Sequence, residues 1–183
     1  MLQLSLLLIA GLAFQTAPAQ NAANTAATVT PPRPVLSAQE RGDIQMARKM
    51  YREAIETYKQ APESAVLWNK IGIAYHQLSE INSAQKAYER AAKLDPKYVA
   101  AINNLGTIYY SKKNYRRAIG QYQRVLRMSP DSASTMANLG SAYFARKQYQ
   151  LASDTYQKAL ALDPEVFESR GGTGTVVQDR TVG

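Results

Sequence analysis

The sequence has no cysteine and a single histidine, His76. Without cysteine the chain can form no disulfide, thiol nucleophile or cysteine-ligated zinc site, and no lipid can be attached to a cysteine near the N-terminus. A single histidine also excludes a metal site built from several imidazoles. The sequence shows no phosphate-binding glycine loop, no paired carboxylates placed to face a groove, and no catalytic triad. We therefore expect a protein that is not an enzyme and that holds no metal or other cofactor.

A hydrophobic run long enough to cross a membrane is also missing near the N-terminus. The apolar segment from Leu4 to Phe14 would span about 16 Å as a helix, roughly half of a ~30 Å hydrocarbon core. It is followed by Ala17-Pro18-Ala19, a small-x-small pattern suited to signal peptidase, although no lysine or arginine precedes the run. We predict a signal peptide over residues 1–19, with an uncleaved membrane anchor as the alternative. Both predict an exported chain, periplasmic or secreted.

Residues 20–34 are rich in alanine, threonine, asparagine and proline and show no helical period. This composition predicts a disordered linker.

The rest of the chain is organised differently, because eight positions recur at a spacing of 34 residues through three units. The recurring sets are Trp68, Ile102, Met136; Ile71, Leu105, Leu139; Gly72, Gly106, Gly140; Tyr75, Tyr109, Tyr143; Ala84, Ala118, Ala152; Tyr88, Tyr122, Tyr156; Ala91, Val125, Ala159; and Pro96, Pro130, Pro164.

Each unit reads as two helices joined by a polar turn. Trp68, Ile71 and Tyr75 fall on one face of a helix, and Ala84 and Tyr88 begin the same pattern in a second helix. A proline ends each unit, where it stops the outgoing helix. One helical hairpin cannot bury its own apolar face, so the units are expected to stack.

The run Trp68-x-x-Ile71-Gly72-x-x-Tyr75, followed by Ala84, Tyr88, Ala91 and Pro96, resembles the tetratricopeptide repeat consensus. The resemblance implies an all-α fold, a right-handed superhelix of antiparallel helix-turn-helix repeats. Its units would be 65–98, 99–132 and 133–166, within a repeat domain over residues 35–166.

A degenerate first unit is predicted over residues 35–64. Its second helix is expected to contain Ile44, Ala47, Tyr51, Ala54 and Ile55, which match the spacing of Ile81, Ala84, Tyr88, Ala91 and Ala92. Gly42-Asp43 would then form the turn, and a short first helix would come from Val35 to Arg41. Pro62 lies later than the pattern requires, which predicts a second helix about one turn longer than in the other units.

The other end of the domain lacks an evident capping helix. Gly171-Gly172-Thr173-Gly174 should break a helix started by residues 165–168, so residues 167–183 are predicted to form a disordered tail. The last unit would then leave apolar surface open. Three explanations fit this pattern: a truncated gene product, a locally closed end, or a partner that covers the surface, including a second copy of the chain.

The resemblance implies a function as well, because in this family the first helix of each unit lines a concave groove that holds a peptide. We therefore expect a non-catalytic scaffold that binds a protein or an extended peptide segment outside the cytoplasm. A self-assembling structural module, or a fragment of a larger repeat protein, are the alternatives. The family pattern places in the groove Asn69, Lys70, Ile73, His76, Asn103, Asn104, Thr107, Tyr110, Ala137, Asn138, Ser141 and Phe144.

Two of these groove residues, Asn104 and Asn138, occupy equivalent positions. An amide side chain can pair with both groups of a peptide unit, so they resemble the asparagine ladder with which repeats of O-GlcNAc transferase hold extended peptide. Lys70 stands at the third position, and simple solvation of the asparagines is the alternative. The carboxylate clamp of chaperone adaptors is absent, because Ile73, Ser134 and Asn138 replace its asparagine, lysine and arginine.

The formal charge of +8 is unevenly distributed. Lys112, Lys113, Arg116 and Arg117 form a basic patch at the turn of one unit, where Asp131 is the only acidic residue of residues 99–132. Such a patch can attract an acidic partner or an anionic membrane face, or can simply keep the surface solvated. Nucleic acid is not expected as a partner, because the chain is expected to be exported.

Overall fold

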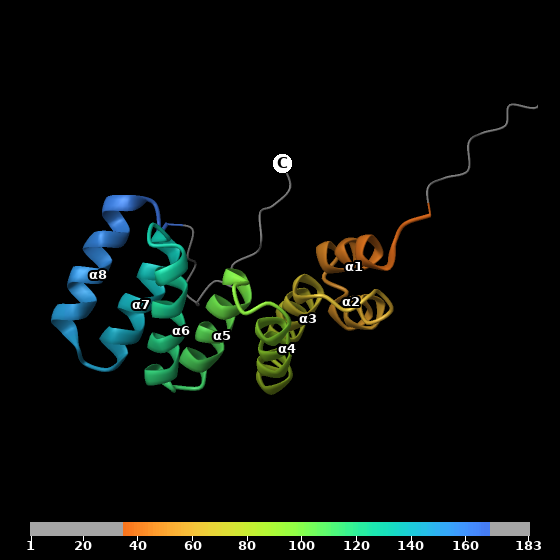
Figure 1. Cartoon of the computed structure of the whole chain (residues 1–183), viewed down its shortest axis with the longest axis horizontal. Coiled ribbons are helices and arrows are strands. Elements are labelled where there is room, and N and C mark those ends of the chain that lie inside the picture. Colours follow the sequence, from red (N-terminus) through yellow and green to blue (C-terminus); the bar gives the residue numbers. More distant parts are fainter. Residues whose placement is uncertain (1–34, 169–183) are drawn as a thin grey trace, which may run out of the picture. The chain divides into compact units, whose positions relative to one another are not determined.

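A computed structural model describes residues 35–168 of the chain (Figure 1). The predicted signal peptide and linker of residues 1–34, and the tail prediction beyond residue 168, lie outside the described residues. Within residues 35–168 every regular element is a helix, and none of the helices is long and apolar enough to span a bilayer. The helices are α1 (Ala38–Ala47), α2 (Tyr51–Tyr58), α3 (Ala65–Gln77), α4 (Ile81–Leu94), α5 (Val99–Ser111), α6 (Tyr115–Met128), α7 (Ala133–Ala145) and α8 (Tyr149–Leu162).

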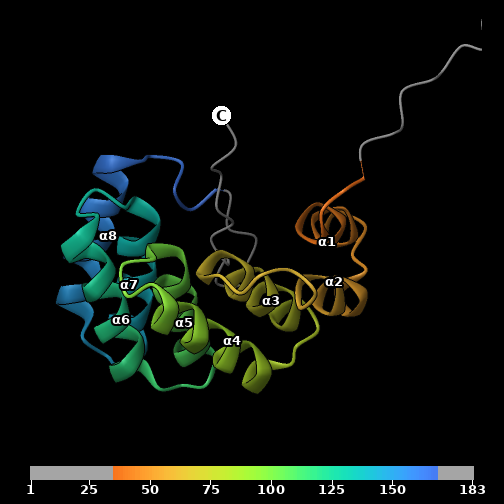
Figure 2. The ribbon, with the colours of Figure 1, turned by 45° about the vertical axis from the view of Figure 1, so that its right-hand side comes forward.

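The helices pack as a stack of hairpins in chain order. Each helix contacts its neighbours in sequence, and the first helices of successive hairpins also touch, α3 on α5 and α5 on α7 (Figures 1 and 2). The core lies between the hairpins as a series of small apolar clusters rather than as one central core. This arrangement confirms the all-α solenoid of helix-turn-helix repeats predicted from the 34-residue period.

A glycine in each first helix lets the second helix of the same unit pack close to it. A Cβ at Gly72 would lie 2.5 Å from Cε1 of Tyr88, and a Cβ at Gly106 would meet Tyr122 at the same distance. The ring of each tyrosine therefore occupies the space that a side chain would need, and Tyr88 and Tyr122 are buried. The recurring glycine and tyrosine of the sequence are two halves of one packing contact.

The turn between the two helices of each unit has the same conformation in all four units. In the first unit the N–H of Met50 donates to Gln45 C=O and that of Lys49 to Met46 C=O, at 2.8 and 2.9 Å. These two bonds are those of a Schellman motif, which satisfies the last carbonyls of a helix. The motif places one residue in the left-handed region, with φ of about 60° at Lys49, Ser79, Lys113 and Lys147.

The first unit is present, but its predicted internal register is wrong. The expected turn at Gly42-Asp43 lies inside α1, which begins after Ser37 with a capping box that includes Glu40. The second helix begins at Tyr51 rather than before Ile44 and is eight residues long, against 14 in α4, so it is shorter and not longer.

The physical reason for the corrected register is the glycine-tyrosine contact. A Cβ at Gly42 would overlap the ring of Tyr58, in the same way that Gly72 faces Tyr88. The first unit therefore aligns with the second at an offset of 30 residues, and the missing residues come from the end of its second helix.

The last described helix is only partly covered. Its buried residues are Ala152 and Ala159, and Val166 packs beside Ala159 after the helix ends. The ring of Phe167 meets that of Tyr156 edge-on, with 5.4 Å between centroids. Within residues 35–168, α8 still leaves four large side chains about half exposed: Tyr149, Leu151, Leu160 and Leu162.

Candidate functional site

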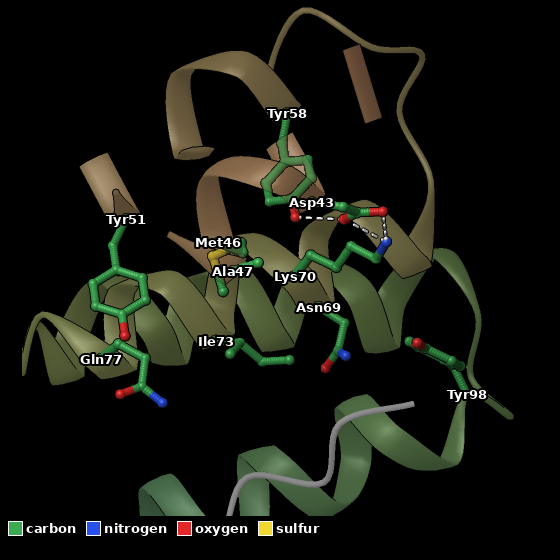
Figure 3. A pocket seen from close by; sticks show the side chains of 10 residues that line it. All are labelled: Asp43, Met46, Ala47, Tyr51, Tyr58, Asn69, Lys70, Ile73, Gln77 and Tyr98. Atoms are coloured by element: carbon green, nitrogen blue, oxygen red, sulfur yellow. Dashed lines mark hydrogen bonds and ion pairs between the residues drawn. The ribbon is translucent and has the colours of Figure 1, made fainter. Parts of the chain in front are cut away.

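A hollow of about 330 Å³ opens beside the first helices of the first two units (Figure 3). Its walls come from α1 and α3, with Tyr51 and Tyr58 from α2 and Tyr98 from the position just before α5. Three of the predicted groove residues line it, namely Asn69, Lys70 and Ile73.

An ion pair joins the two helices across the hollow. Nζ of Lys70 donates to both carboxylate oxygens of Asp43 at 2.7 Å, and the Tyr58 hydroxyl donates to Oδ1 of Asp43 at 2.6 Å (Figure 3). Burial raises the pKa of Tyr58, and the hydrogen bond to the Asp43 carboxylate raises it further. The lysine at the third position of the predicted asparagine ladder is thus held by a carboxylate, and the pair is neutral overall.

The contact between Tyr58 and Asp43 has counterparts in two further units. A hydroxyl or carboxylate 15 residues before the tyrosine accepts its proton: Thr107 for Tyr122 at 3.4 Å and Ser141 for Tyr156 at 3.1 Å. In the second unit the equivalent residue is Ile73, which cannot accept a hydrogen bond. The hydroxyl of Tyr88 accordingly has no partner among the described residues although the side chain is 0% exposed.

The asparagines of the first helices are bonded to one another. Nδ2 of Asn104 donates to Oδ1 of Asn69 at 3.0 Å, and Nδ2 of Asn138 lies 3.4 Å from Oδ1 of Asn103. Thr135 also donates to Oδ1 of Asn103, at 3.3 Å. All of these side chains are buried, so the asparagines are not simply solvated; they join α3 to α5 and α5 to α7. Binding of a peptide backbone by Asn104 and Asn138 stays a prediction.

The other predicted groove residues differ in exposure. Thr107 and Ala137 are buried, His76, Tyr110 and Ser141 are partly exposed, and Phe144 is 59% exposed. Burial lowers the pKa of His76, so the imidazole is held in its neutral form over a wider pH range than in water.

The predicted basic patch lies at the α5–α6 turn. Lys112, Lys113, Arg116 and Arg117 are all exposed. Lys112 donates to the neutral side chains of Asn82 and Gln85 on α4, at 3.0 and 2.8 Å. Because these acceptors carry no charge, the positive charge of the patch is preserved.

Among the described residues, no three histidine, cysteine or acidic side chains come together. Sequence reasoning missed Asp43, Met46 and Tyr98 as lining residues of the hollow. Asp43 was missed because the first unit was aligned in the wrong register. With Gly42 placed opposite Gly72, Asp43 falls at the position of Ile73 and is recognisable as a first-helix residue.

Comparisons with known proteins agree with this geometry. The tetratricopeptide repeat model matches residues 98–165, and a second TPR repeat model matches residues 72–113. The crystal structure of MamA is similar with a TM-score of 0.66 and 24% identity, over 72% of this chain and 79% of that chain. That of YrrB, described as a TPR protein with an unusual peptide-binding site, has a TM-score of 0.64 and 20% identity, over 70% and 68% of the two chains.

None of the curated proteins matches the sequence. At identities below 25% the similar structures establish the fold and leave the ligand open. Proteins of this repeat family generally serve as non-catalytic interaction scaffolds. The repeat models, the structural likeness and the four glycine-tyrosine hairpins lead to one conclusion: the chain is a tetratricopeptide repeat protein.

Proposed function

We propose that the chain is a non-catalytic scaffold that binds an extended peptide segment along its first helices, in the periplasm or outside the cell. The observation that carries the proposal is the hollow between α1 and α3, which contains three of the residues that the family pattern assigns to the groove. The likeness to YrrB, a TPR protein with a peptide-binding site, supports the same reading.

The chemistry of the hollow indicates what kind of side chain it would accept. Met46, Ala47 and Ile73 make its walls apolar, while the exposed Gln77 offers an amide group at the edge. Asp43 and Lys70 neutralise each other, so the hollow does not select for a charged residue. An apolar side chain of the partner would fill the space, and the amide of Gln77 would pair with the backbone of the partner.

Site-specific crosslinking tests this proposal. A photoreactive residue at Gln77, which is exposed beside the hollow, should capture a partner from periplasmic or culture extract, and one at Gln157 on α8 should not. Ala47→Trp would fill the hollow and should abolish capture at position 77, whereas Ala161→Trp on the exposed side of α8 should not. Capture that is equal at both positions, or that survives Ala47→Trp, would remove the groove as the binding site.

Replacing Asn104 and Asn138 by alanine tests the ladder hypothesis. The double variant should weaken the captured complex if the amides contact the peptide. Because the same amides join the first helices, the thermal midpoint of the free variant must be measured beside its affinity. Unchanged affinity would eliminate the ladder.

The proposed location has its own test. If residues 1–19 are a signal peptide, the mature chain should be found in the periplasmic or secreted fraction with Gln20 as its N-terminus. A membrane-bound chain that keeps Met1 would support the anchor instead.

A self-assembling module is the second candidate, and the exposed side chains of α8 favour it. Leu151, Leu160 and Leu162 are between 41% and 46% exposed, so the last described helix keeps apolar side chains against which a second copy of the chain would pack. Sedimentation over a range of concentrations decides this point. A monomer at every concentration would dismiss the candidate, and Leu160→Glu should dissociate any oligomer that forms through α8.

A further inference from the structure

The turns of the last two units carry a surface that the groove does not use. Residues 110–117 surround the α5–α6 turn and residues 144–149 surround the α7–α8 turn, and we call these two segments the basic-aromatic edge. Both turns have the same Schellman geometry, and both lie at the lower side of the stack in Figure 1, opposite the α6–α7 connection. The two segments therefore face the same side of the solenoid.

The charge of the edge is uniformly positive. Residues 110–117 contain Lys112, Lys113, Arg116 and Arg117, residues 144–149 contain Arg146 and Lys147, and neither segment contains an acidic residue. Among the described residues no carboxylate comes within ion-pair distance of these six cations. Asp131, the only acid between the two segments, lies at the other end of the hairpins.

Aromatic side chains flank both basic turns. Tyr110 and Tyr115 pack with 5.3 Å between ring centroids, and Phe144 and Tyr149 with 5.4 Å. Phe144 and Tyr149 are nevertheless 59% and 57% exposed, so their contact leaves more than half of each side chain open. A phenylalanine in this position gives up the stabilisation that burial of its ring would provide.

The fold does not require these residues. The second unit makes the same turn with Leu78, Ser79 and Glu80, and it has His76 and Ile81 where the later units have aromatic residues. Neither cations nor paired rings are needed for the hairpin. The composition of the edge therefore points to a ligand and not to folding.

A lipid surface accounts for both components of the edge. Anionic headgroups attract clustered lysine and arginine, and the headgroup region is where exposed aromatic rings find a favourable environment. An acidic protein surface is the competing partner, since it would attract the cations and would also bury Phe144; binding to poly-glutamate distinguishes it. Nucleic-acid bases stack on open ring faces, whereas Phe144 and Tyr149 pack against each other at an interplanar angle of 64°. We infer that the basic-aromatic edge docks the scaffold on an anionic lipid membrane, with Phe144 and Tyr149 entering the headgroup region.

Vesicle binding tests the inference. The full chain is mixed with phosphatidylcholine vesicles, with and without phosphatidylglycerol, and bound protein is measured by flotation. Any binding by the N-terminal apolar segment appears on both kinds of vesicle and is common to all variants. The chain should prefer the anionic vesicles, and Lys112→Gln with Lys113→Gln should reduce this preference about 25-fold, because each basic residue at an anionic surface contributes about fivefold.

The aromatic component and the location need separate variants. Phe144→Ser with Tyr149→Ser should lower binding to the anionic vesicles about tenfold without changing the charge. Lys93→Gln with Lys97→Gln removes the same charge as the lysine variant but at the opposite end of the hairpins, and it should retain most of the binding. Helical circular dichroism and the unfolding midpoint confirm that each variant is folded.

Three results would overturn the inference. The first is equal binding to neutral and anionic vesicles, and the second is an equal loss in the Lys93/Lys97 and Lys112/Lys113 variants. The third is an unchanged affinity of the Phe144/Tyr149 variant, which would leave only a diffuse electrostatic attraction. Binding to poly-glutamate that needs Lys112 and Lys113, without preference for anionic vesicles, would assign the edge to an acidic protein instead.

Discussion

The tyrosines of the second helices allow a sharp test, because one chemical change should have opposite effects in two units. Removing the hydroxyl of Tyr58 breaks a 2.6 Å hydrogen bond to the Asp43 carboxylate. Removing the hydroxyl of Tyr88 eliminates a buried polar group that has no partner among the described residues. Both rings remain, so the glycine contacts of Gly42 and Gly72 are preserved in the two variants.

The magnitudes follow from these two environments. A hydrogen bond to a charged group contributes about 1.5–3 kcal/mol, and we take the lower end for Tyr58→Phe because Asp43 keeps its bond to Lys70. A buried group without a partner costs about 1–3 kcal/mol, so Tyr88→Phe should raise the free energy of unfolding by about 1 kcal/mol or more. The two variants should therefore differ by roughly 3 kcal/mol, which corresponds to about 10 °C in melting temperature for a domain of this size.

Urea and thermal unfolding, followed by circular dichroism at neutral pH, measure this difference. The reasoning is refuted if Tyr88→Phe destabilises the chain as much as Tyr58→Phe does. A further arm supplies the missing acceptor: Ile73→Thr places a hydroxyl where Thr107 accepts from Tyr122. Ile73→Thr should destabilise the chain less when Tyr88 is present than when it is combined with Tyr88→Phe, by about 1 kcal/mol in the free energy of unfolding. Only the tyrosine hydroxyl can donate to the new acceptor.

Three further outcomes are expected. His76→Gln should make the free energy of unfolding depend less on pH below neutrality. Burial lowers the pKa of His76, so the neutral imidazole contributes fully to stability above its unfolded pKa of about 6.5, and this contribution is lost as the pH falls below that value. An unchanged acid slope in urea titrations between neutral and mildly acidic pH would contradict this. Lys113→Gly should stabilise the chain by about 0.5–1 kcal/mol, because a φ of 59° favours glycine over a residue with a side chain. Lys112→Gly is the control and should destabilise the chain, because its φ of −80° suits any residue. Equal effects in thermal melts would show that the turn is not strained. Tyr88→Phe should also make the folded chain less sensitive to alkali. Burial raises the pKa of Tyr88, so the neutral hydroxyl contributes fully to the pH-dependent part of stability below its unfolded pKa of about 10, and this contribution is lost as the pH rises through the folded pKa. Identical alkaline unfolding of variant and parent would contradict this.

The repeat period predicted the hairpins because both partners of each packing contact recur in it. Gly72 and Tyr88 lie in one unit, and their spacing is repeated by Gly106 and Tyr122. The first unit was misread because Ile44, Ala47 and Tyr51 fit a helical stripe at the wrong offset, and apolar spacing alone does not distinguish α1 from a second helix. The spacing from Gly42 to Tyr58, which equals that from Gly72 to Tyr88, was the signal that would have resolved the register.

The environment of the asparagines could not be predicted in the same way. Asn104 pairs with Asn69, 35 residues earlier, so the contact joins two units and is one residue out of step with the period. A 34-residue pattern shows which residues are equivalent and does not show which residues of neighbouring units meet. For the same reason the sequence did not predict the ion pair of Asp43 and Lys70, which depends on how α1 lies against α3.

The amide contacts between the first helices have a thermodynamic consequence for ligand binding. One N–H of the Asn104 amide is bonded to Asn69 and one N–H of the Asn138 amide lies at Asn103, so a ligand that takes either of these hydrogens must loosen a junction between two units. Ligand binding at these asparagines and the loosening of the junction are then thermodynamically linked, so each changes the free energy of the other by the same amount. Variants that weaken a junction would make the scaffold more adaptable toward partners and less selective among them.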